Sequence, residues 1–382
     1  MKNFRHLSLF SGCGGMDLGI QGGFEVNKEF LADCKNKKQF VKLPKTKFET
    51  VFANDIKKSS KIFWNHNNLN KNKIFTEGSI VDIVKANDKE NIFPSNIDIV
   101  TGGFPCQDFS VSGLRRGFDS HKSHLNKLEE INQNETRGTL YLWMKEVIRI
   151  TNPKIFIAEN VKGITNIGDV FKVIKNDFSN TGKGYTVFSR ELYVPDYGIP
   201  QSRRRIFFIG VCNEFIQKKK IKLDEDMLYP EREFGDSGES FERLKKYPTA
   251  KSFFDGLNDP ENEKKDVSQM KYSKAKYIKG SQGQTQVRED GIAPTIRSEH
   301  HGNIEFRYLH KDNGGSFNKQ RRLTVRECGR IQTFPDSIDF VFNSDCGNLS
   351  ASEAYKLIGD AVPPLLSYKI AKKLEIFLSK YL

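Results

Sequence analysis

The sequence predicts an α/β fold in which a doubly wound, mostly parallel sheet carries helices on both faces, together with a second, smaller domain. Short apolar strands alternate with amphipathic segments up to about residue 213, and this alternation is typical of a parallel sheet wrapped by helices. Residues 214 to about 320 are instead polar, lysine-rich and turn-rich, which indicates a separate lobe. A chain of 382 residues is long enough for both parts.

The strands are predicted from apolar runs that end in polar or glycine-containing segments. They are His6–Phe10, Val51–Asp55, Ile97–Val100, Lys154–Ala158, Tyr185–Phe188 and Arg205–Val211. An amphipathic helix is expected at Thr139–Ile150. A last helix is expected after Pro363 and Pro364, because prolines suit a first helical turn. Its apolar positions recur at helical spacing and should pack against the rest of the protein: Leu365, Leu366, Ile370, Leu374 and Phe377.

The composition limits the class of protein. Lys+Arg number 61 against 48 Asp+Glu, a formal net charge of +13, and this excess favours a polyanionic partner; the alternative is lysine that only solvates the surface. The six cysteines form no Cys-x-x-Cys pair and have no histidine at ligand spacing, so we expect neither a metal site nor a disulfide framework. No apolar run approaches the ~20 residues of a membrane span, and Met1–Arg5 leads into the first strand without a signal-peptide core. We therefore expect a reduced, cytoplasmic protein.

One cysteine stands where a parallel sheet presents its reactive groups. Cys106 follows Pro105 in the segment Gly102–Ser110, soon after the strand Ile97–Val100, and α/β sheets bind ligands at the carboxyl ends of their strands. The proline stiffens the backbone that holds the thiol. The position predicts a nucleophile; the alternative is an inert buried thiol.

A glycine-rich turn follows the first strand. The segment Ser11–Gly19 runs from glycines into a predicted helix, an arrangement that lets backbone amides approach a nucleotide; a plain tight turn is the alternative. The strand Val51–Asp55 ends in an acidic residue, at the position that holds ribose hydroxyls in nucleotide-binding folds. Together these features indicate a cofactor that carries an adenosine.

The chain resembles the DNA cytosine-5 methyltransferases in a series of short blocks that follow the order of that family along almost the whole sequence. The blocks are Phe10-x-Gly12-x-Gly14, Pro105-Cys106, Glu159-Asn160-Val161, Gln201-x-Arg203-x-Arg205, Arg326-Glu327-Cys328-x-Arg330-Ile331-Gln332 and Gly359-Asp360-Ala361-Val362. The resemblance implies a class I, Rossmann-like methyltransferase fold, with S-adenosylmethionine as methyl donor and S-adenosylhomocysteine as product. It also implies a monomeric bacterial restriction–modification enzyme that acts on double-stranded DNA in the nucleoid, with any cognate endonuclease acting separately.

The resemblance also implies a division into domains, because in the family the last helix packs back onto the first domain. We expect residues 1–213 plus 355–382 to form the catalytic domain and 214–354 the target-recognition domain. Segments 28–50 and 121–136 are insertions relative to the compact family pattern. The first is lysine-rich and suits a DNA-backbone contact, with a solvated surface hairpin as the alternative. The second should lengthen the loop that closes over DNA.

Four residues are predicted to carry the chemistry. Methylation at carbon 5 of cytosine needs a temporary covalent partner, and Cys106 would add to carbon 6. Glu159, at the end of an apolar strand, would protonate or hydrogen-bond the ring nitrogen N3; a helix cap or a surface ion pair is the alternative. By resemblance, Arg205 would contact the cytosine O2 and hold Glu159, and Arg203 would support the cysteine loop or the backbone near the base. For Arg204 an ordinary phosphate-facing arginine is preferred.

The cofactor residues implied by the resemblance come from several parts of the chain. They are Phe10, Gly12, Gly14, Gly15, Met16, Asp55, Ile56, Ser79, Ile80, Pro105, Leu140, Asp360, Ala361 and Val362. The chain departs from the family where Ser79 replaces an aspartate and Asp360 replaces an asparagine, which puts the specific contacts of these two residues in doubt. Ile56 stands where an aromatic residue often stacks on adenine, so apolar contact without stacking is expected.

The DNA contacts are expected from two places. Gln107, Ser110 and Ser112 belong to the loop that would close on a base rotated out of the duplex. Arg297, in the segment 291–303, is the candidate for reading a guanine edge. Two alternatives remain: a tRNA cytosine-5 methyltransferase, although the chain lacks the Cys-Phe-Thr motif of that branch, and a non-catalytic DNA-binding regulator.

Overall fold

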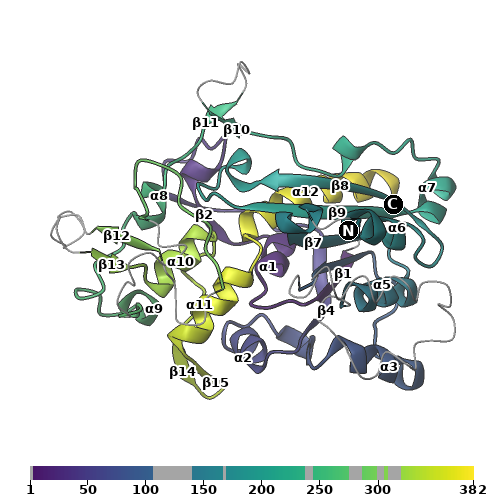
Figure 1. Ribbon diagram of the computed structural model, residues 1–382, viewed down its shortest axis with the longest axis horizontal. Helices are drawn as coiled ribbons and strands as arrows, with labels where there is room; N and C mark the ends of the chain where they lie inside the picture. The colour runs from purple at the N-terminus through teal and green to yellow at the C-terminus, as the bar shows by residue number, and fades with distance from the viewer. Residues whose placement is uncertain are drawn as a thin grey trace.

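The computed structural model describes residues 3–105, 140–166, 169–236, 244–274, 286–298, 305–308 and 320–382. Within them, the largest sheet has seven strands in the order β5-β4-β1-β6-β7-β9-β8 (Figure 1). The strands are β1 Phe4–Leu9, β4 Phe48–Asp55, β5 Phe75–Glu77, β6 Ile99–Gly103, β7 Ile155–Val161, β8 Tyr185–Tyr193 and β9 Arg204–Cys212. Strands β5, β4, β1, β6 and β7 pair in parallel, and β9 is antiparallel to both β7 and β8. The predicted mostly parallel sheet is confirmed.

Helices cover both faces of this sheet. They are α1 Gly15–Gln21, α2 Lys58–His66, α3 Ile80–Glu90, α5 Leu140–Thr151, α6 Val170–Ser179, α7 Asn213–Lys219 and α12 Pro364–Tyr381. Helices α3, α5 and α6 pack in a row, whereas α1 packs against α12. The approach of α1 to α12 is very close, because a Cβ on Gly19 would lie 2.3 Å from the Pro364 carbonyl oxygen. The five predicted apolar positions of the last helix are buried, so its packing role is confirmed.

The second part of the chain consists of short elements gathered on the left of Figure 1. They are β10 Phe234–Gly235, β11 Lys245–Lys246, α8 Lys251–Phe254, α9 Val267–Met270, β12 Phe306–Tyr308, β13 Gln320–Arg322, α10 Val325–Ile331, β14 Phe342–Ser344, β15 Gly347–Leu349 and α11 Ala351–Asp360. The domain boundary proposed between residues 354 and 355 falls inside α11. The described structure also contains short 3-10 helices, which are η1 Lys28–Phe30, η2 Lys71–Lys73, η5 Lys162–Asn166, η6 Val194–Tyr197 and η7 Glu225–Met227.

A buried ionic cluster holds these short elements together. Glu327 closes a capping box with Thr324 at the start of α10, and its carboxylate also accepts from Arg321 at 2.8 Å and from Arg307 at 3.1 Å. Burial opposes the charge, but the two guanidinium groups prevail and lower the pKa of Glu327 to about 2. The hairpin β12–β13 is thereby attached to α10.

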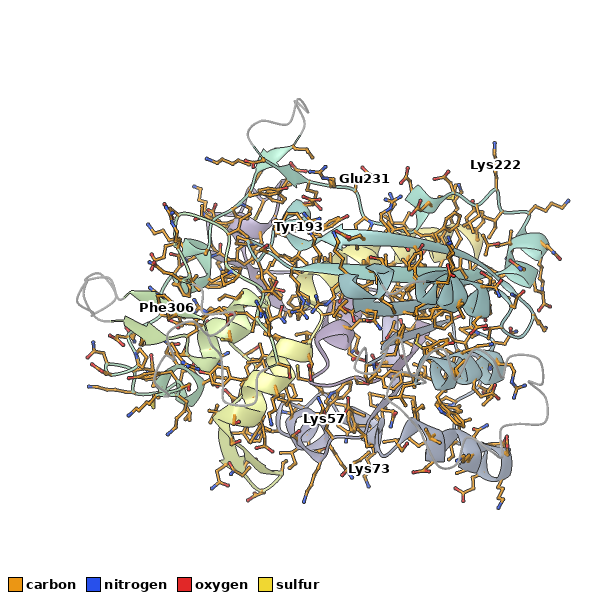
Figure 2. The ribbon with its side chains drawn as sticks, viewed as in Figure 1. Lys57, Lys73, Tyr193, Lys222, Glu231 and Phe306 are labelled. Atoms are coloured by element: carbon orange, nitrogen blue, oxygen red, sulfur yellow. The ribbon has the colours of Figure 1, made fainter. Side chains whose placement is uncertain are left out.

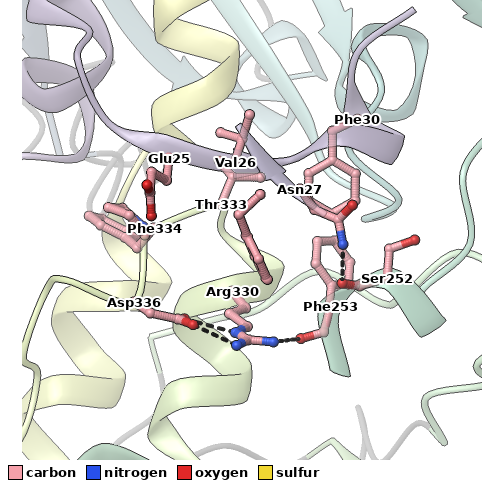
Figure 3. A pocket seen from close by; sticks show the side chains of 12 residues that line it. Glu25, Val26, Asn27, Phe30, Ser252, Phe253, Arg330, Thr333, Phe334 and Asp336 are labelled. Atoms are coloured by element: carbon pink, nitrogen blue, oxygen red, sulfur yellow. Dashed lines mark hydrogen bonds and ion pairs between the residues drawn. The ribbon is translucent and has the colours of Figure 1, made fainter. Parts of the chain in front are cut away.

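The inserted segment 28–50 lies between the two parts. The strands β2 (Glu25–Asn27) and β3 (Phe40–Lys42) pair antiparallel, and residues 48–50 already belong to β4. The Asn27 side-chain amide donates to the Ser252 carbonyl at 2.9 Å, and the rings of Phe30 and Phe253 lie 5.2 Å apart. Around these contacts is a cavity of about 110 Å³, on the far side of which Arg330 donates to the Asp336 carboxylate (Figure 3). The segment therefore contacts α8 through Phe30 and α10 through Phe40, whose ring lies 5.3 Å from the Arg330 guanidinium.

No helix in the described ranges is long and apolar enough to span a membrane.

Candidate active site and cofactor cradle

Glu159 and Arg205 meet at one end of the sheet. Glu159 lies near the carboxyl end of β7, opposite Gly103 of β6, and is only 7 % exposed. Arg205 comes from the antiparallel strand β9, and its Nε lies 3.0 Å from Glu159 Oε1. Burial raises the pKa of Glu159, against the opposing effects of Arg205 and Arg203. The carboxyl therefore retains its proton to a higher pH than an exposed glutamate does.

Arg203 is 1 % exposed and lies just before β9. Its guanidinium donates to the Ile296 carbonyl at 2.9 Å, the Ala361 carbonyl at 2.8 Å and the Gly359 carbonyl at 3.2 Å. Burial, together with Arg205, lowers the pKa of Arg203. These contacts join the segment that carries Arg297 to the carboxyl end of α11, which carries Asp360, a connection that the sequence does not predict.

The backbone leading to Cys106 is held by β7. The Asn160 side-chain amide donates to the Phe104 carbonyl at 3.1 Å, and a Cβ on Gly103 would lie 3.0 Å from Glu159 Oε2. The glycine thus lets the carboxylate lie against the β6 backbone. Pro105 is the last described residue of this segment. Cys106, Gln107, Ser110, Ser112 and the insertion 121–136 lie outside the described residues.

The glycine turn after β1 has an open concave side. Gly12 and Gly14 have φ of +53° and +70°, in the left-handed region that favours glycine. The Gly12 amide donates to Asp55 Oδ2 at 2.9 Å, and its carbonyl accepts from Trp64 Nε1 at 3.1 Å. A Cβ on Gly12 would meet nothing within 4 Å, whereas one on Gly15 would lie 2.6 Å from the Val362 carbonyl. The turn therefore packs against α2 and the Val362 loop on the side of Gly14 and Gly15, whereas the space beside Gly12 is open.

The other predicted cofactor residues lie on several different elements. Ile56 is 67 % exposed directly after Asp55. Lys57, which directly precedes α2 (Figure 2) and which the sequence patterns did not single out, forms an ion pair with Asp360 at the end of α11, with Nζ 2.7 Å from Oδ2. The Ser79 hydroxyl accepts from the Val81 amide and caps α3. Ile80 and Val362 are buried, and half-buried side chains pack against the core at Phe10, Met16, Leu140 and Ala361.

An open cleft of about 820 Å³ separates Arg205 from the predicted recognition segment. Its lining comprises Val161, Ser202, Arg205, Gln286, Arg288, Asp290, Gly291, Ile292, Pro294, Thr295 and Arg297. Two backbone hydrogen bonds join the two sides of the cleft. The Ser202 amide donates to the Ala293 carbonyl at 2.7 Å, and the Ala293 amide donates to the Pro200 carbonyl at 2.8 Å. The tertiary structure thus brings Arg205 and the exposed Arg297 into one cleft. Across the described ranges, no group of three or more His, Cys, Asp or Glu side chains could hold a metal ion.

Comparison with known families identifies the chain. The model of the C-5 cytosine-specific DNA methylase family matches residues 4–375. The chain belongs to this family. The protein is therefore a DNA cytosine-5 methyltransferase, and the predicted family resemblance is confirmed.

The relatives of this methylase cover nearly all of it. It is 32 % identical to the Type II methyltransferase M.BspRI of Lysinibacillus sphaericus, over 99 % of this chain and 83 % of that protein. It is 30 % identical to the Type II methyltransferase M.NgoPII of Neisseria gonorrhoeae, over 97 % of this chain and 94 % of that protein. The solved structure of the S. pombe Dnmt2 methyltransferase has a TM-score of 0.60 at 18 % identity, covering 98 % of this chain and 99 % of that one. This likeness confirms the fold.

Proposed function

We propose that this methylase transfers a methyl group from S-adenosylmethionine to carbon 5 of a flipped-out cytosine in double-stranded DNA, through a covalent bond between Cys106 and carbon 6. We further propose that it acts as a monomer and protects host DNA in a restriction–modification system. The observation that carries the proposal is the buried Glu159 carboxyl, paired with Arg205 beside the backbone that leads to Pro105 and Cys106.

The proposed chemistry needs a proton at the ring. When the Cys106 thiolate bonds to carbon 6, negative charge develops in the pyrimidine, and a proton from Glu159 to N3 removes that charge. Burial raises the pKa of Glu159, which makes the carboxyl a better proton reservoir for N3 than an exposed glutamate would be. Carbon 5 then takes the methyl group and loses its proton to a base. The bond between carbon 6 and Cys106 breaks, which releases the thiolate, and the N3 proton returns to Glu159. Arg205 holds the Glu159 carboxyl in place throughout.

The cradle around Gly12 fits a cofactor that carries an adenosine. The space beside Gly12 is open, and the Gly12 amide is held by its hydrogen bond to the Asp55 carboxylate. The exposed side chain of Ile56, directly after Asp55, offers an apolar surface. S-adenosylmethionine, when bound, supplies an electrophilic methyl group. The remaining cofactor residues predicted from the sequence stay part of this proposal, with Ser79 acting as a helix cap beside the site.

The cleft of about 820 Å³ supports access of an extruded base. Stacked cytosine shields its ring faces, so an enzyme that attacks carbon 6 must take the base out of the duplex. Arg205 and Arg297 both line the cleft, Arg205 from β9 and Arg297 from the recognition segment. We propose that Arg297 contacts base edges while the loop with Gln107, Ser110 and Ser112 closes over the base.

The test is methyl transfer by the purified protein. Labelled S-adenosylmethionine is supplied with duplex DNA or with tRNA, and the wild type is compared with Cys106→Ser and with Cys346→Ser, a control at an exposed cysteine. We expect transfer to DNA by the wild type and the control, and none by Cys106→Ser. Expression in a host without cytosine methylation, followed by genome-wide mapping of 5-methylcytosine, then gives the target site.

Three other outcomes would each contradict a different part of the proposed function. Transfer that survives Cys106→Ser would overturn the covalent mechanism. Transfer to tRNA alone would make the enzyme a tRNA methyltransferase, and DNA binding with no transfer to any acceptor would make it a regulator.

A further inference from the structure

A second cleft, of about 450 Å³, lies between the beginning of the inserted segment and strand β11. Its walls are residues 28–36 on one side and residues 245–252 on the other, with Phe234 at the base. Lysines line both walls: Lys28 and Lys35 on the first, Lys245 and Lys246 on the second. Glu29 is the one acidic residue in the described lining, so the cleft carries an excess of positive charge.

Among the described residues, none forms an ion pair with any of these four lysines. In the described part of the chain none of them has a carboxylate within the 4.0 Å of an ion pair. Nearby lysines of α12 differ, since Lys369 pairs with Glu233 and Lys373 with Glu231. Ammonium groups held around one cleft without counter-charges attract an external anion.

The walls of the cleft are fixed by contacts behind it. Phe30 packs on Phe253, Asn27 donates to the Ser252 carbonyl, and the Tyr247 hydroxyl donates to Asp196 Oδ1 at 2.7 Å. Figure 3 shows the first two residue pairs meeting between β2 and α8. The lysine pairs therefore lie on two walls whose separation is set by buried packing, so the two walls do not have to be brought together when a ligand binds.

The second cleft adjoins the first. Thr249 lines the second cleft, and its chain neighbour Ala250 donates from its amide to the carbonyl of Gly291, which lines the first cleft, at 2.7 Å. Ring contacts connect the two clefts as well. Arg204, the chain neighbour of Arg205 in the first cleft, lies over the Tyr193 ring, and that ring meets the ring of Tyr247 in the second cleft edge-on at 6.4 Å. Figure 2 places Tyr193 where β8 approaches the second part of the chain.

We propose that this lysine-lined cleft binds the phosphodiester backbone of DNA that flanks the methylated site. The inference rests on the proposed DNA substrate, and it assigns to segment 28–50 and β11 a contact outside the recognition sequence. Lysine suits this task because its ammonium is a point charge that contacts phosphates without reading the bases. A duplex held in the first cleft continues for several base pairs on either side, which brings phosphates within reach of an adjoining cleft.

The experiment measures affinity as a function of duplex length. Two duplexes of about 12 and about 30 base pairs, roughly 40 and 100 Å long at 3.4 Å per pair, carry the same target site at their centre. The variants are Lys28→Gln with Lys35→Gln, Lys245→Gln with Lys246→Gln, and all four together. The matched control is Lys218→Gln with Lys219→Gln on α7, at the opposite end of the molecule (Figure 1).

We expect the fourfold variant to bind the long duplex about tenfold more weakly and the short duplex as the wild type does. The slope of log K against log salt for the long duplex should fall by ~0.9 for each phosphate that the variant no longer neutralises. Methyl transfer at saturating short duplex should be unchanged, as should the thermal midpoint, because the substituted side chains are exposed or half-buried.

Three results would overturn the proposal: an equal decrease in affinity for both duplexes, no decrease beyond that of the control, or a decrease for tRNA but not for DNA. Failure of the proposed function itself is distinguishable, because it would appear as absent methyl transfer by the wild type on either duplex.

Discussion

Lys57 and Asp360, which are 303 residues apart in the sequence, form an ion pair with 2.7 Å between Nζ and Oδ2 at the edge of the cofactor cradle. We expect Asp360→Asn to lower the affinity for S-adenosylmethionine a few-fold relative to S-adenosylhomocysteine, because only the former carries a sulfonium charge that a carboxylate attracts. Calorimetric titration of both ligands checks this. Both side chains are nearly half exposed, so the free energy of unfolding should change by less than about 1 kcal/mol. The control is Asp345→Asn, in the exposed β14–β15 turn. If the ratio of the affinities for the two ligands changes no more in Asp360→Asn than in this control, the expectation is contradicted.

Arg205→Gln should shift the pH dependence of catalysis. Arg205 opposes the burial that raises the pKa of Glu159, so without it the carboxyl keeps its proton to still higher pH. The alkaline limb of kcat/KM that reports Glu159 should move upward, and kcat should fall by roughly 10²-fold. Glu159→Gln should lose the limb altogether. Arg204→Gln, at the exposed neighbour, is the control and should leave the limb in place; an unshifted limb in Arg205→Gln would exclude Glu159 as the acid.

Arg203→Lys should weaken the coupling between the cofactor and DNA. A single ammonium cannot reproduce the guanidinium contacts to Ile296, Gly359 and Ala361, which join the proposed recognition segment to the proposed cofactor cradle. We expect the ratio of DNA affinities with and without S-adenosylhomocysteine to fall toward one, and the reciprocal ratio to fall equally. Fluorescence anisotropy at matched salt measures both. A ratio equal to that of the wild type, in a variant with native circular dichroism, would show that Arg203 only packs.

Gly15→Ala should destabilise the protein. The added Cβ would lie 2.6 Å from the Val362 carbonyl oxygen, and this contact involves backbone on both sides, so relief requires α1 to move. A decrease of about 1–3 kcal/mol in the free energy of unfolding is expected from urea titration. The control is Gly163→Ala, where the nearest atom is a methyl group at 3.8 Å. Equal stability of the two variants would refute the close approach.

Asp17→Asn should remove a pH-dependent loss of folding stability. Burial raises the pKa of Asp17 to about 7, although the Ser8 hydroxyl donates to it. The folded state therefore keeps a proton that the unfolded state loses above pH ~4. The wild type loses this stability as the pH rises from about 4 to about 7, whereas the variant does not. Between pH ~5 and pH ~8 the variant should gain roughly 3 kcal/mol relative to the wild type in denaturant titrations; a pH-independent difference would contradict the shift.

The predicted strands and the last helix are confirmed because each depends on local pattern. The run Ile155–Ala158 is apolar at every position since β7 is buried on both faces, and Leu365 to Phe377 recur at helical spacing because one face of α12 packs on α1. Some ends differ, since β8 continues to Tyr193 where the predicted strand stopped at Phe188. Pairing with β9 extends that strand, and such pairing is not visible in the local sequence.

The sequence by itself determined the type of sheet, the order of the family's blocks and the residue types needed for the chemistry, because these depend on local hydrophobic period and on residues at fixed spacing. The tertiary structure alone decided which side chains meet. The partners of Arg203 are 93 to 158 residues away, and Lys57 reaches Asp360 only because α11 returns to the edge of α2. Burial likewise raises the pKa of Glu159, since desolvation depends on everything packed around a carboxyl and not on its neighbours in the chain.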